Sequence, residues 1–463
     1  MQKLFDEVAS LDKRCYEEFF LSEDILMEHA SSGMAEYIRS NFKNNSKIIV
    51  VCGGGNNGAD GIALARLLHP DYDVSIYYAK KPTSKMALLQ AKRAKAVGVK
   101  ECKKLKECDV LVDAIVGTGF NGEFNDEIKA ILKEMNSLRA FKIACDVPSG
   151  LYADGTLDPH TFKADITITM GALKRSLFSD AAKEYVGEIR VANLGISRSR
   201  YEIPTTWQLL DPSDLSLPHR TSTSANKGCY GHLAVVCGEK IGASVIAGSA
   251  AIRFGSGLVS LISNENVTIP YELMQSHSLP SSTTAIALGM GLGVEFCDDE
   301  LTCLLDNNLP LVLDADIFYH PMFPQLLKRE RIVLTPHPKE FTQILRLCGI
   351  ADIDVTTLQN NRFTYVEQFC AAYPNTVLVL KGANVIIGKN DRFFINPLGT
   401  VALAKGGSGD VLSGLVGALL AQKYTPLDAA LQGSLAHTLA ARGFDKNNYA
   451  LTPFDLIERV TVL

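Results

Sequence analysis

The stretch Lys405-Gly406-Gly407-Ser408-Gly409-Asp410-Val411-Leu412 decides the fold of the second half of the chain. Three glycines lead into an aspartate, and an apolar run from Val411 to Ala421 predicts a helix behind it. Glycines let backbone N–H groups approach an anion, and a helix N-terminus adds its positive dipole end. An aspartate at this position can accept a proton from a hydroxyl that attacks a phosphate. A tight turn with a capping Asp has the same pattern, so the neighbouring motifs must decide.

Outward from this stretch, short apolar runs end in polar or glycine-rich clusters. These runs are Leu233–Cys237, Ala285–Leu288, Leu311–Leu313, Ile332–Leu334 and Val377–Leu380. The clusters that follow the last four are Gly289–Gly293, Asp314–Asp316, Thr335–Glu340 and Lys381–Asn384. Such alternation predicts an α/β fold with a parallel sheet, whose cleft lies at the carboxyl ends of the strands.

Several residues in these clusters could carry chemistry. Prolines on both sides fix the backbone of His337, and Lys381 could place an ammonium on a phosphate. A structural histidine and a solvated lysine are the alternatives at these two positions. Asp316 and Glu340 could be helix caps or neighbours of Mg²⁺. His437 lies within an apolar helix predicted from Leu427 to Ala441, so we expect it to pack there.

The first half follows the same rule. A β-branched run, Lys47–Cys52, ends in Gly53–Gly61, and a helix is predicted from Ile62 to Leu68. Strand, glycine loop and helix form the phosphate-binding arrangement of doubly wound folds. The loop is not G-x-G-x-x-G, because asparagines and an aspartate interrupt it, which argues against a dehydrogenase. A turn rich in Asn and Gly remains the alternative.

Two further strands predicted in the first half are followed by acidic residues. The predicted strands are Asp73–Tyr78, Val110–Val112, Lys142–Cys145 and Ile166–Met170. Asp113 and Asp146 follow two of them, and with Asp60 they favour a site at one edge of the sheet. Asn57, Asp113 and Ser149 offer oxygen ligands suited to a hard cation.

Length and composition bound the remaining possibilities. A chain of 463 residues is expected to form two or three domains. The net charge of −5 without a basic run argues against nucleic acid, and no run approaches the roughly 20 apolar residues that a bilayer needs. Eleven cysteines without a C-x-x-C pair, and no secretory leader, predict a reducing cytoplasm. We expect a cytoplasmic enzyme that forms a homo-oligomer.

The stretch Ile196–Lys227 shows little periodicity and reads as a linker with an entry loop, which places the domain boundary near residues 200 to 205. The sequence therefore predicts two α/β domains, 1–202 and 203–463. Each is expected to be a mainly parallel sheet flanked by helices.

The first-half motifs resemble a known family. Gly-Gly-x-Asn-Asn-Gly-x-Asp-Gly, Val112-Asp113-Ala114, Gly-Thr-Gly and Asp-Val-Pro-Ser-Gly look together like the Rossmann-like epimerase domain of bifunctional NAD(P)H-hydrate repair enzymes. The resemblance implies interconversion of R and S hydrates of NADH and NADPH, with Asp146 at the reacting ring. It implies K⁺ held by Asn57, Asp113 and Ser149. It implies substrate contacts from Asn56, Asn57, Gly58, Ala59, Asp60, Gly117, Thr118, Gly119, Phe120, Asn121, Gly122 and Glu123. Ala59 departs from the usual Gly.

The second-half motifs resemble the ribokinase-like dehydratase domain of the same family. This resemblance implies nucleotide contacts from Lys381, Gly382, Ala383, Asn384, Val385 and Gly409. It implies that Ala243, Gly291, His337 and Asp410 face the hydrated nicotinamide, with ADP as phosphoryl donor and Mg²⁺ at the site. Lys339, Asn384 and Ser408 depart from the usual residues, and Asn384 bears on the nucleotide contacts.

Three readings follow from these motifs. In the first, an epimerase supplies the S hydrate to a dehydratase on the same chain. In the second, a ribokinase-like small-molecule kinase is fused to a nucleotide-sensing domain. In the third, the first half is a non-catalytic binding module, although a binding relic has no need of Asn57, Asp60, Asp113 and Asp146 together.

Overall fold

The computed structural model describes residues 1–293, 296 and 298–463. The chain divides into two compact units, Gln2–Trp207 and Gln208–Leu463. Among the described residues, no helix combines the length and apolarity that a bilayer crossing requires.

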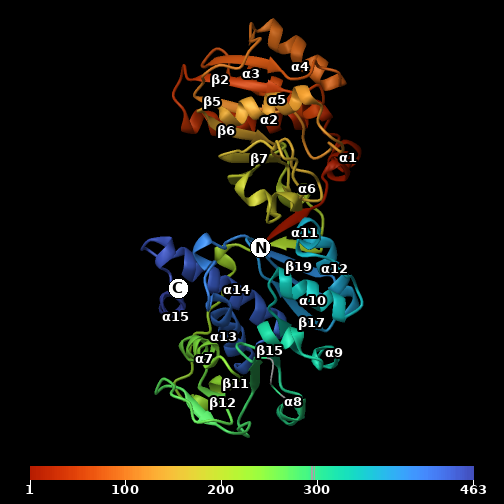
Figure 1. The fold of residues 1–463 in the computed structure, drawn as a ribbon. Helices are drawn as coiled ribbons and strands as arrows, with labels where there is room; N and C mark the ends of the chain where they lie inside the picture. Colours follow the sequence, from red (N-terminus) through yellow and green to blue (C-terminus); the bar gives the residue numbers. More distant parts are fainter. Residues whose placement is uncertain (294–295, 297) are drawn as a thin grey trace. The chain divides into compact units, whose positions relative to one another are not determined.

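The N-terminal unit alternates strands with helices along most of its length (Figure 1). Its strands are β1 (Gln2–Phe5), β2 (Lys47–Cys52), β3 (Asp73–Tyr78), β4 (Lys100–Glu101), β5 (Val110–Ala114), β6 (Phe141–Cys145), β7 (Ile166–Met170), β8 (Leu173–Lys174) and β9 (Glu188–Ala192). Its helices are α1 (Ala9–Glu18), α2 (Glu23–Asn41), α3 (Asn56–Leu68), α4 (Lys85–Ala96), α5 (Asp126–Ser137) and α6 (Arg198–Tyr201).

Seven of these strands form one parallel sheet in the order β4-β3-β2-β5-β6-β7-β9. Alternate side chains of β2 enter opposite cores, because successive residues of a strand face opposite ways. Ile48 and Val50 pack with residues of α2, α3 and α4, whereas Ile49 and Val51 pack with residues of α5. Helices therefore cover both faces, and the carboxyl edge is left for a ligand.

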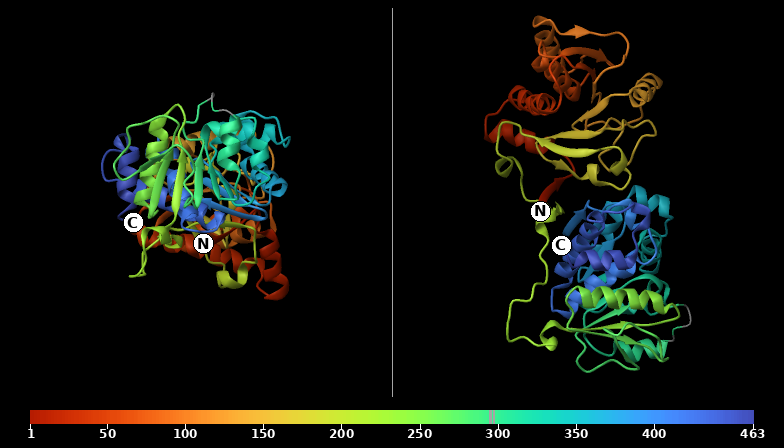
Figure 2. Two further views of the ribbon diagram at one scale, coloured as in Figure 1. Left: turned by 90° about the horizontal axis from the view of Figure 1, so that it is seen from below. Right: turned by 90° about the vertical axis from the view of Figure 1, so that its left-hand side faces the viewer.

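The C-terminal unit is also α/β (Figures 1 and 2). Its strands are β10 (Trp207–Leu209), β11 (His232–Val236), β12 (Leu258–Ile262), β13 (Met274–Ser276), β14 (Ala285–Leu288), β15 (Leu311–Leu313), β16 (Ile332–Leu334), β17 (Thr376–Leu380), β18 (Val385–Lys389) and β19 (Arg392–Asn396). Its helices are α7 (Ile241–Arg253), α8 (Asp298–Leu305), α9 (Phe323–Leu326), α10 (Pro338–Leu347), α11 (Val355–Asn360), α12 (Arg362–Ala372), α13 (Ser408–Ala421), α14 (Pro426–Arg442) and α15 (Pro453–Val460).

The sheet of this unit runs β13-β12-β11-β14-β15-β16-β17-β18-β19-β10. The strands from β13 to β17 are parallel, and β18 and β19 continue the sheet antiparallel. Figure 2 shows α7 along one face of the strands β11 and β12, which it contacts.

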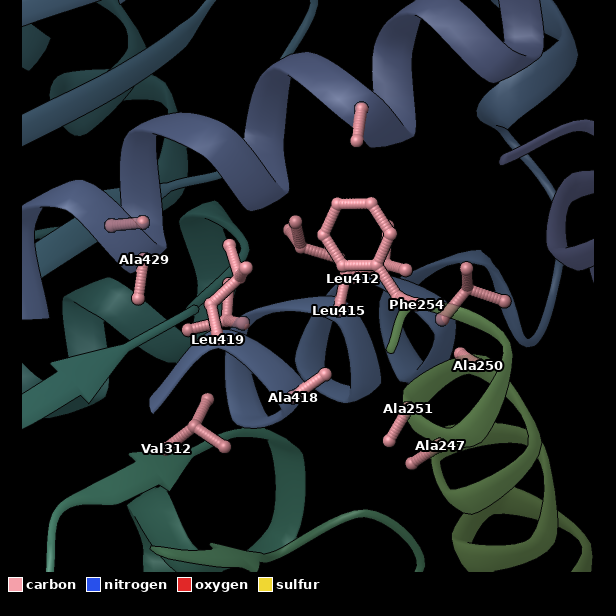
Figure 3. Close-up of a cluster of buried hydrophobic side chains, with 14 of the residues drawn as sticks. Ala247, Ala250, Ala251, Phe254, Val312, Leu412, Leu415, Ala418, Leu419 and Ala429 are labelled. Atoms are coloured by element: carbon pink, nitrogen blue, oxygen red, sulfur yellow. The ribbon is translucent and has the colours of Figure 1, made fainter. Parts of the chain in front are cut away.

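Helix α13 lies in the middle of the core. Its residues Val411–Ala421 are all buried, and it packs against α7 and α14 (Figure 3). A Cβ at Gly414 would come 2.2 Å from the Ala247 carbonyl oxygen, so glycine is what allows α13 and α7 to approach this closely. The apolar run that the sequence predicted as a helix is thus the central element of its unit.

The predicted strands agree closely with those observed. β3, β7, β14, β15 and β16 have the predicted bounds, and β5, β6, β11 and β17 differ by one or two residues at one or both ends. The stretch from Ile196 to Lys227 is more structured than expected, because it contains α6 and β10. Trp207 is buried there, with its ring 4.8 Å from the guanidinium carbon of Arg175.

Candidate active sites

In the N-terminal unit, the glycine loop brings the start of α3 against the end of β2. A Cβ at Gly58 would lie 2.0 Å from the Gly53 carbonyl oxygen, so no larger residue fits there. One residue earlier, Asn57 faces the loop that follows β5: a Cβ at Gly117 would lie 3.4 Å from Asn57 Oδ1 and 3.1 Å from Asp146 Oδ2. The Gly117 backbone therefore lies between the side chains of Asn57 and Asp146 and is close to both.

Asp146 follows β6 in the left-handed region, with φ of 71°. This conformation is uncommon for a residue with a side chain, and it turns the carboxylate toward the strand ends. Its Oδ1 accepts hydrogen bonds from Lys174 Nζ at 2.5 Å and from Met170 N at 3.1 Å. Its Oδ2 points to Thr118, whose N and Oγ1 both lie at 3.5 Å. One oxygen is thus held by the protein, and the other is directed toward the loop after β5.

The pKa values of the two acidic groups Asp146 and Asp60 are shifted in opposite directions. Burial acts to raise the pKa of Asp146, but the Lys174 ammonium and the hydrogen bonds outweigh it and hold this pKa below its ordinary value. Burial raises the pKa of Asp60 well above its ordinary value, and the charges of Asp146 and Asp12 add to the effect. Asp146 is therefore a carboxylate at neutral pH, while the environment of Asp60 favours its protonated form.

Aromatic rings support the loop from Gly117 to Glu123. Phe120 stacks on Phe124 with 4.6 Å between the ring centroids, and Tyr152 lies 6.3 Å from Phe120. The Tyr152 hydroxyl also donates to the Gly122 carbonyl oxygen at 3.1 Å. Gly119 and Gly122 have open space where a Cβ would be, and Asn121 and Glu123 are exposed. This loop can therefore present backbone and ring surface to a planar ligand.

Asp113 and Ser149 lie buried at the ends of adjacent strands. The Ser149 hydroxyl and N–H both donate to Asp113, each at 2.7 Å. Burial raises the pKa of Asp113 to about 6 against the lowering effect of these hydrogen bonds. Asn57 Nδ2 is buried and has no hydrogen-bond partner in the described part of the chain. Carboxylate, hydroxyl and carboxamide groups form an oxygen-bearing set, which fits a hard cation such as K⁺.

The side chains of two predicted substrate contacts, Ala59 and Asn56, have contacts within the protein. The methyl group of Ala59 is buried with Met27 and Met86, and its N–H donates to the Gly55 carbonyl oxygen. The Ala59 side chain therefore packs in the core, so a substrate contact at this position stays a prediction that concerns its backbone. Asn56 donates to Glu23 Oε1 at 2.7 Å and is exposed.

In the C-terminal unit, α13 begins at the glycine stretch. Gly407 is its N-cap with φ of 87°, a conformation that favours glycine. A Cβ at Gly409 would lie 3.3 Å from Lys381 Nζ and 3.6 Å from Asp314 Oδ2. The first N–H groups of α13 and the Lys381 ammonium thus stand next to one another. Both attract anions.

Lys381 and Asp314 form an ion pair at the ends of β17 and β15, in which Asp314 is buried and Lys381 is partly accessible. Lys381 Nζ donates to Asp314 Oδ1 at 2.8 Å, and Ser413 Oγ donates to Asp314 Oδ2 at 2.8 Å. Burial acts to lower the pKa of Lys381, but Asp314 and Glu340 raise it above its ordinary value. The lysine is therefore charged, and its ammonium is paired with Asp314 rather than with solvent alone.

Asp410 lies in the first turn of α13 and is partly accessible. Burial and the charge of Asp314 raise its pKa to about 6, and Lys381 acts in the opposite direction. A carboxylate with this pKa can accept a proton near neutral pH. It therefore has the basicity that proton removal from a substrate hydroxyl requires.

His337 caps helix α10 while its ring remains half exposed. Its Nδ1 accepts from the Glu340 N–H at 3.2 Å, and Glu340 Oε2 accepts from the His337 N–H at 2.7 Å. Burial and the charge of Lys381 lower the pKa of His337. Glu340 is buried, which raises its pKa to about 7. His337 Nε2 also lies 3.1 Å from Glu340 Oε1, so both ring nitrogens contact Glu340. The half-exposed ring therefore offers a ligand a contact surface rather than a free nitrogen.

Gly291 and Ala243 are neighbours at the ends of other strands. Gly291 has φ of 66°, and a Cβ there would lie 2.5 Å from the Lys240 carbonyl oxygen and 3.1 Å from the Ala243 methyl. Two residues on, the Gly293 N–H donates to Asp316 Oδ2 at 2.9 Å. The glycine loop after β14 therefore contacts Lys240, which precedes α7, and Asp316, which lies two residues after Asp314.

The turn from Lys381 to Val385 connects β17 with β18. Gly382 and Ala383 are exposed, whereas Asn384 is 3% exposed and Val385 packs into the core. Val385 can therefore reach a nucleotide through its backbone but not through its side chain. His437 is buried, as expected for packing, and its Nε2 lies 3.0 Å from the Ser408 carbonyl oxygen.

Lys174 and Ser413 belong to these sites but were not predicted. Lys174 comes from the short strand β8, outside any of the recognised motifs, and its ammonium reaches back to Asp146. Ser413 looked like part of an apolar helix. A polar residue inside an apolar helical run, one turn after Asp410, was the available signal for it.

Comparisons with known proteins match both halves of the chain. A family model described as YjeF-related protein N-terminus matches residues 23–176, and one described as NAD(P)H-hydrate dehydratase matches residues 233–461. The bifunctional NAD(P)H-hydrate repair enzyme of Helicobacter pylori is 45% identical and covers 100% of both chains. The one from Escherichia coli is 32% identical over 94% of this chain and 89% of its own. The crystal structure of ADP/ATP-dependent NAD(P)H-hydrate dehydratase from Bacillus subtilis, co-crystallised with ATP and Mg²⁺, is 29% identical. It covers 53% of this chain and 92% of that chain, with a TM-score of 0.45.

Proposed function

Because the chain belongs to the family of bifunctional NAD(P)H-hydrate repair enzymes, we propose that it performs its two reactions at two aspartates, Asp146 and Asp410. The N-terminal unit epimerises the R and S hydrates of NADH and NADPH. The C-terminal unit converts the S hydrate back to the dihydronicotinamide. The observation that carries this assignment is that each aspartate lies at the carboxyl edge of its own sheet beside a lysine ammonium, that of Lys174 or Lys381.

Epimerisation requires the ring carbon to lose and regain its hydroxyl on opposite faces. Loss of the hydroxyl leaves a cationic ring, and an anionic Asp146 beside that ring stabilises the charge. Lys174 keeps Asp146 ionised and fixes its orientation through Oδ1. The loop from Gly117 to Glu123, with Phe120, would hold the substrate against Oδ2.

A potassium ion would be held by Asn57, Asp113 and Ser149. When bound, it supplies a fixed positive charge that favours the ionised form of Asp113. Asp113 and Ser149 are joined by hydrogen bonds at the ends of β5 and β6, so the ion would tie the loops after these strands together.

Dehydration needs a better leaving group than hydroxide. We infer that Asp410 takes the proton of the ring hydroxyl as its oxygen attacks the terminal phosphorus of ADP, which releases AMP. Inorganic phosphate then leaves with the bonding pair of the carbon–oxygen bond, and the adjacent ring carbon loses a proton to solvent, which restores the C=C double bond. The N–H groups at the start of α13 and the Lys381 ammonium would neutralise the phosphate charge.

Mg²⁺ would enter with the nucleotide. No group of three or more His, Cys, Asp or Glu suited to a metal occurs in the described residues. The Asp314 carboxylate is already held by Lys381 and Ser413. This fits a Mg²⁺ bound mainly by phosphate oxygens and water, where it would stabilise charge on the transferred phosphoryl group.

The purified chain tests both assignments when it is given R-hydrate and ADP and NADH recovery is followed by absorbance. Asp146→Ala should prevent recovery from R-hydrate but not from S-hydrate. Asp410→Asn should prevent recovery from both, while R-to-S conversion continues. A stable phosphorylated product without NADH recovery would instead support the small-molecule kinase, and equal rates in the variants and the wild type would refute the two aspartates.

A further inference from the structure

Asp60 lies on the same face of α3 as Asn57. The two residues are three positions apart in the first turns of the helix, a spacing that makes side chains neighbours. Gly58, Ala59 and Gly61 are buried around it, whereas Asp60 keeps part of its surface accessible. The charge of Asp146 is the largest charge effect on Asp60, so the Asp60 carboxyl lies near Asp146, which borders the same glycine, Gly117, as Asn57 does.

The Asp60 carboxyl has no hydrogen-bond or ion-pair partner in residues 1–293, 296 and 298–463. The nearby Lys174 ammonium cannot serve, because its three donors go to Asp146 Oδ1, Thr169 Oγ1 and the Met170 carbonyl oxygen. The Ser31 hydroxyl donates to the backbone oxygen of Asp60 and leaves the side chain free. Near it lie the carboxylates of Asp146, Asp12 and Glu23, whose charges oppose ionisation of Asp60.

We propose that Asp60 is the general acid of the epimerase, the group that gives its proton to the hydroxyl leaving the hydrated ring. This inference rests on the proposed epimerase function. Asp146 and Asp60 are then a pair of carboxyl groups whose environments push them to opposite protonation states, an arrangement typical of acid and counter-ion roles. Asp146 is paired with an ammonium, and Asp60 has no such partner within the described part of the chain.

The Asp60 proton moves to the hydroxyl oxygen while the carbon–oxygen bond breaks, and the oxygen leaves as water with the bonding pair. The lone pair of the ring nitrogen forms a C=N bond, and Asp146 faces the resulting cation. Water then adds to the other face and releases one proton to solvent, and Asp60 takes one proton back. In the reverse direction, ionised Asp60 accepts the proton of the water that adds on its own face.

Asp60→Asn tests the role, because it removes the proton while keeping nearly the same size. R-to-S conversion is measured in the full chain without nucleotide, so that dehydration cannot interfere. We expect kcat to fall roughly 100-fold or more with KM changed by less than about threefold, since general acid–base catalysis contributes on the order of 10²–10⁴. Asp71→Asn, at an exposed aspartate of the same unit, is the matched control and should leave kcat unchanged. A rise in KM at unchanged kcat would overturn the proposal, because it would reduce Asp60 to a binding contact.

A second readout does not depend on turnover. Infrared difference spectra of wild type minus Asp60→Asn near neutral pH should contain the C=O stretch of a protonated carboxylic acid, and its absence would overturn the proposal. Asp60→Glu, which retains an acid, should recover part of the lost kcat. The same assay distinguishes a failure of the epimerase function from a failure of the Asp60 role. A wild type that does not interconvert the hydrates refutes the epimerase function. Equal conversion by wild type and Asp60→Asn refutes the role of Asp60 alone.

Discussion

Lys174 Nζ lies 2.5 Å from Asp146 Oδ1, and the lysine side chain is entirely closed to solvent. A lysine is rarely buried without a charged partner, and here the partner is the proposed catalytic carboxylate. The pair thus links the stability of the N-terminal unit to its proposed reaction, because both depend on Asp146 being ionised.

Lys174→Met should therefore damage both stability and epimerisation. Removing one member of a buried pair costs about 3–5 kcal/mol. In the wild type, the lowered pKa of Asp146 contributes stability that is present above the ordinary aspartate pKa and is lost as pH falls through the folded-state pKa. In the variant, the pKa of Asp146 should rise, so the acid limb of the epimerase rate should move to higher pH.

Urea unfolding and pH–rate profiles of wild type and Lys174→Met measure these two effects. Lys163→Met, at an exposed lysine of the same unit, is the control. An unchanged acid limb would mean that Lys174 does not govern the ionisation of Asp146.

Dehydration should depend on the ionisation of Asp410. Its pKa of about 6 means that the proposed base is mostly ionised at pH 7 and mostly protonated at pH 5. We expect kcat/KM for the S hydrate, measured at saturating nucleotide, to fall about tenfold per pH unit below about 6. A rate that stays level well below this pH would contradict the role of Asp410 as base.

Gly409→Ala should weaken nucleotide binding. The added methyl would stand 3.3 Å from Lys381 Nζ, in the space beside the first N–H groups of α13 where the phosphates are proposed to bind. A loss of about 1.4 kcal/mol would raise the KM for ADP roughly tenfold. Gly406→Ala is the matched control, because a Cβ there meets nothing within 4 Å. Equal values of KM for the two variants would exclude close contact at Gly409.

His437 should make the core of the C-terminal unit sensitive to acid. Burial lowers its pKa from 6.5 to about 4, so the unfolded chain binds a proton first as the pH falls. Stability is therefore lost between pH 6.5 and about 4, with about 2 kcal/mol gone by pH 5. Hydrogen exchange of α13 and α14 at pH 7 and pH 5 measures this loss. His437→Gln should reduce the difference, and an identical difference in the variant would exclude His437 as its source.

Elements with strong local signals were predictable from the sequence. β-branched runs such as Ile166–Met170 favour a strand. Glycine is required in the first turn of α3, where a Cβ at Gly58 would lie 2.0 Å from the Gly53 carbonyl oxygen. The antiparallel strands β18 and β19 were not anticipated, because their runs contain Gly388 and a polar turn that resemble loop sequence.

Partnerships made by folding could not be predicted in the same way. Nothing near Lys174 in the sequence indicates that its ammonium meets Asp146, since 28 positions separate them. Likewise, Asp314 meets Lys381 across 67 positions and Ser413 across 99. Ala59 shows the converse: it lies inside a recognised motif, but the helical turn directs its methyl group into the core.

Asp113 pairs with Ala144 across the neighbouring strands β5 and β6, and Asp146 comes two residues after Ala144. The separation between the proposed ion-holding and catalytic carboxylates is therefore set by the hydrogen-bonded spacing of two strands rather than by either loop. The loop after β5 can accordingly change in length or sequence during evolution, which would change the contacts with the coenzyme. The positions of Asp113 and Asp146 relative to each other would not change.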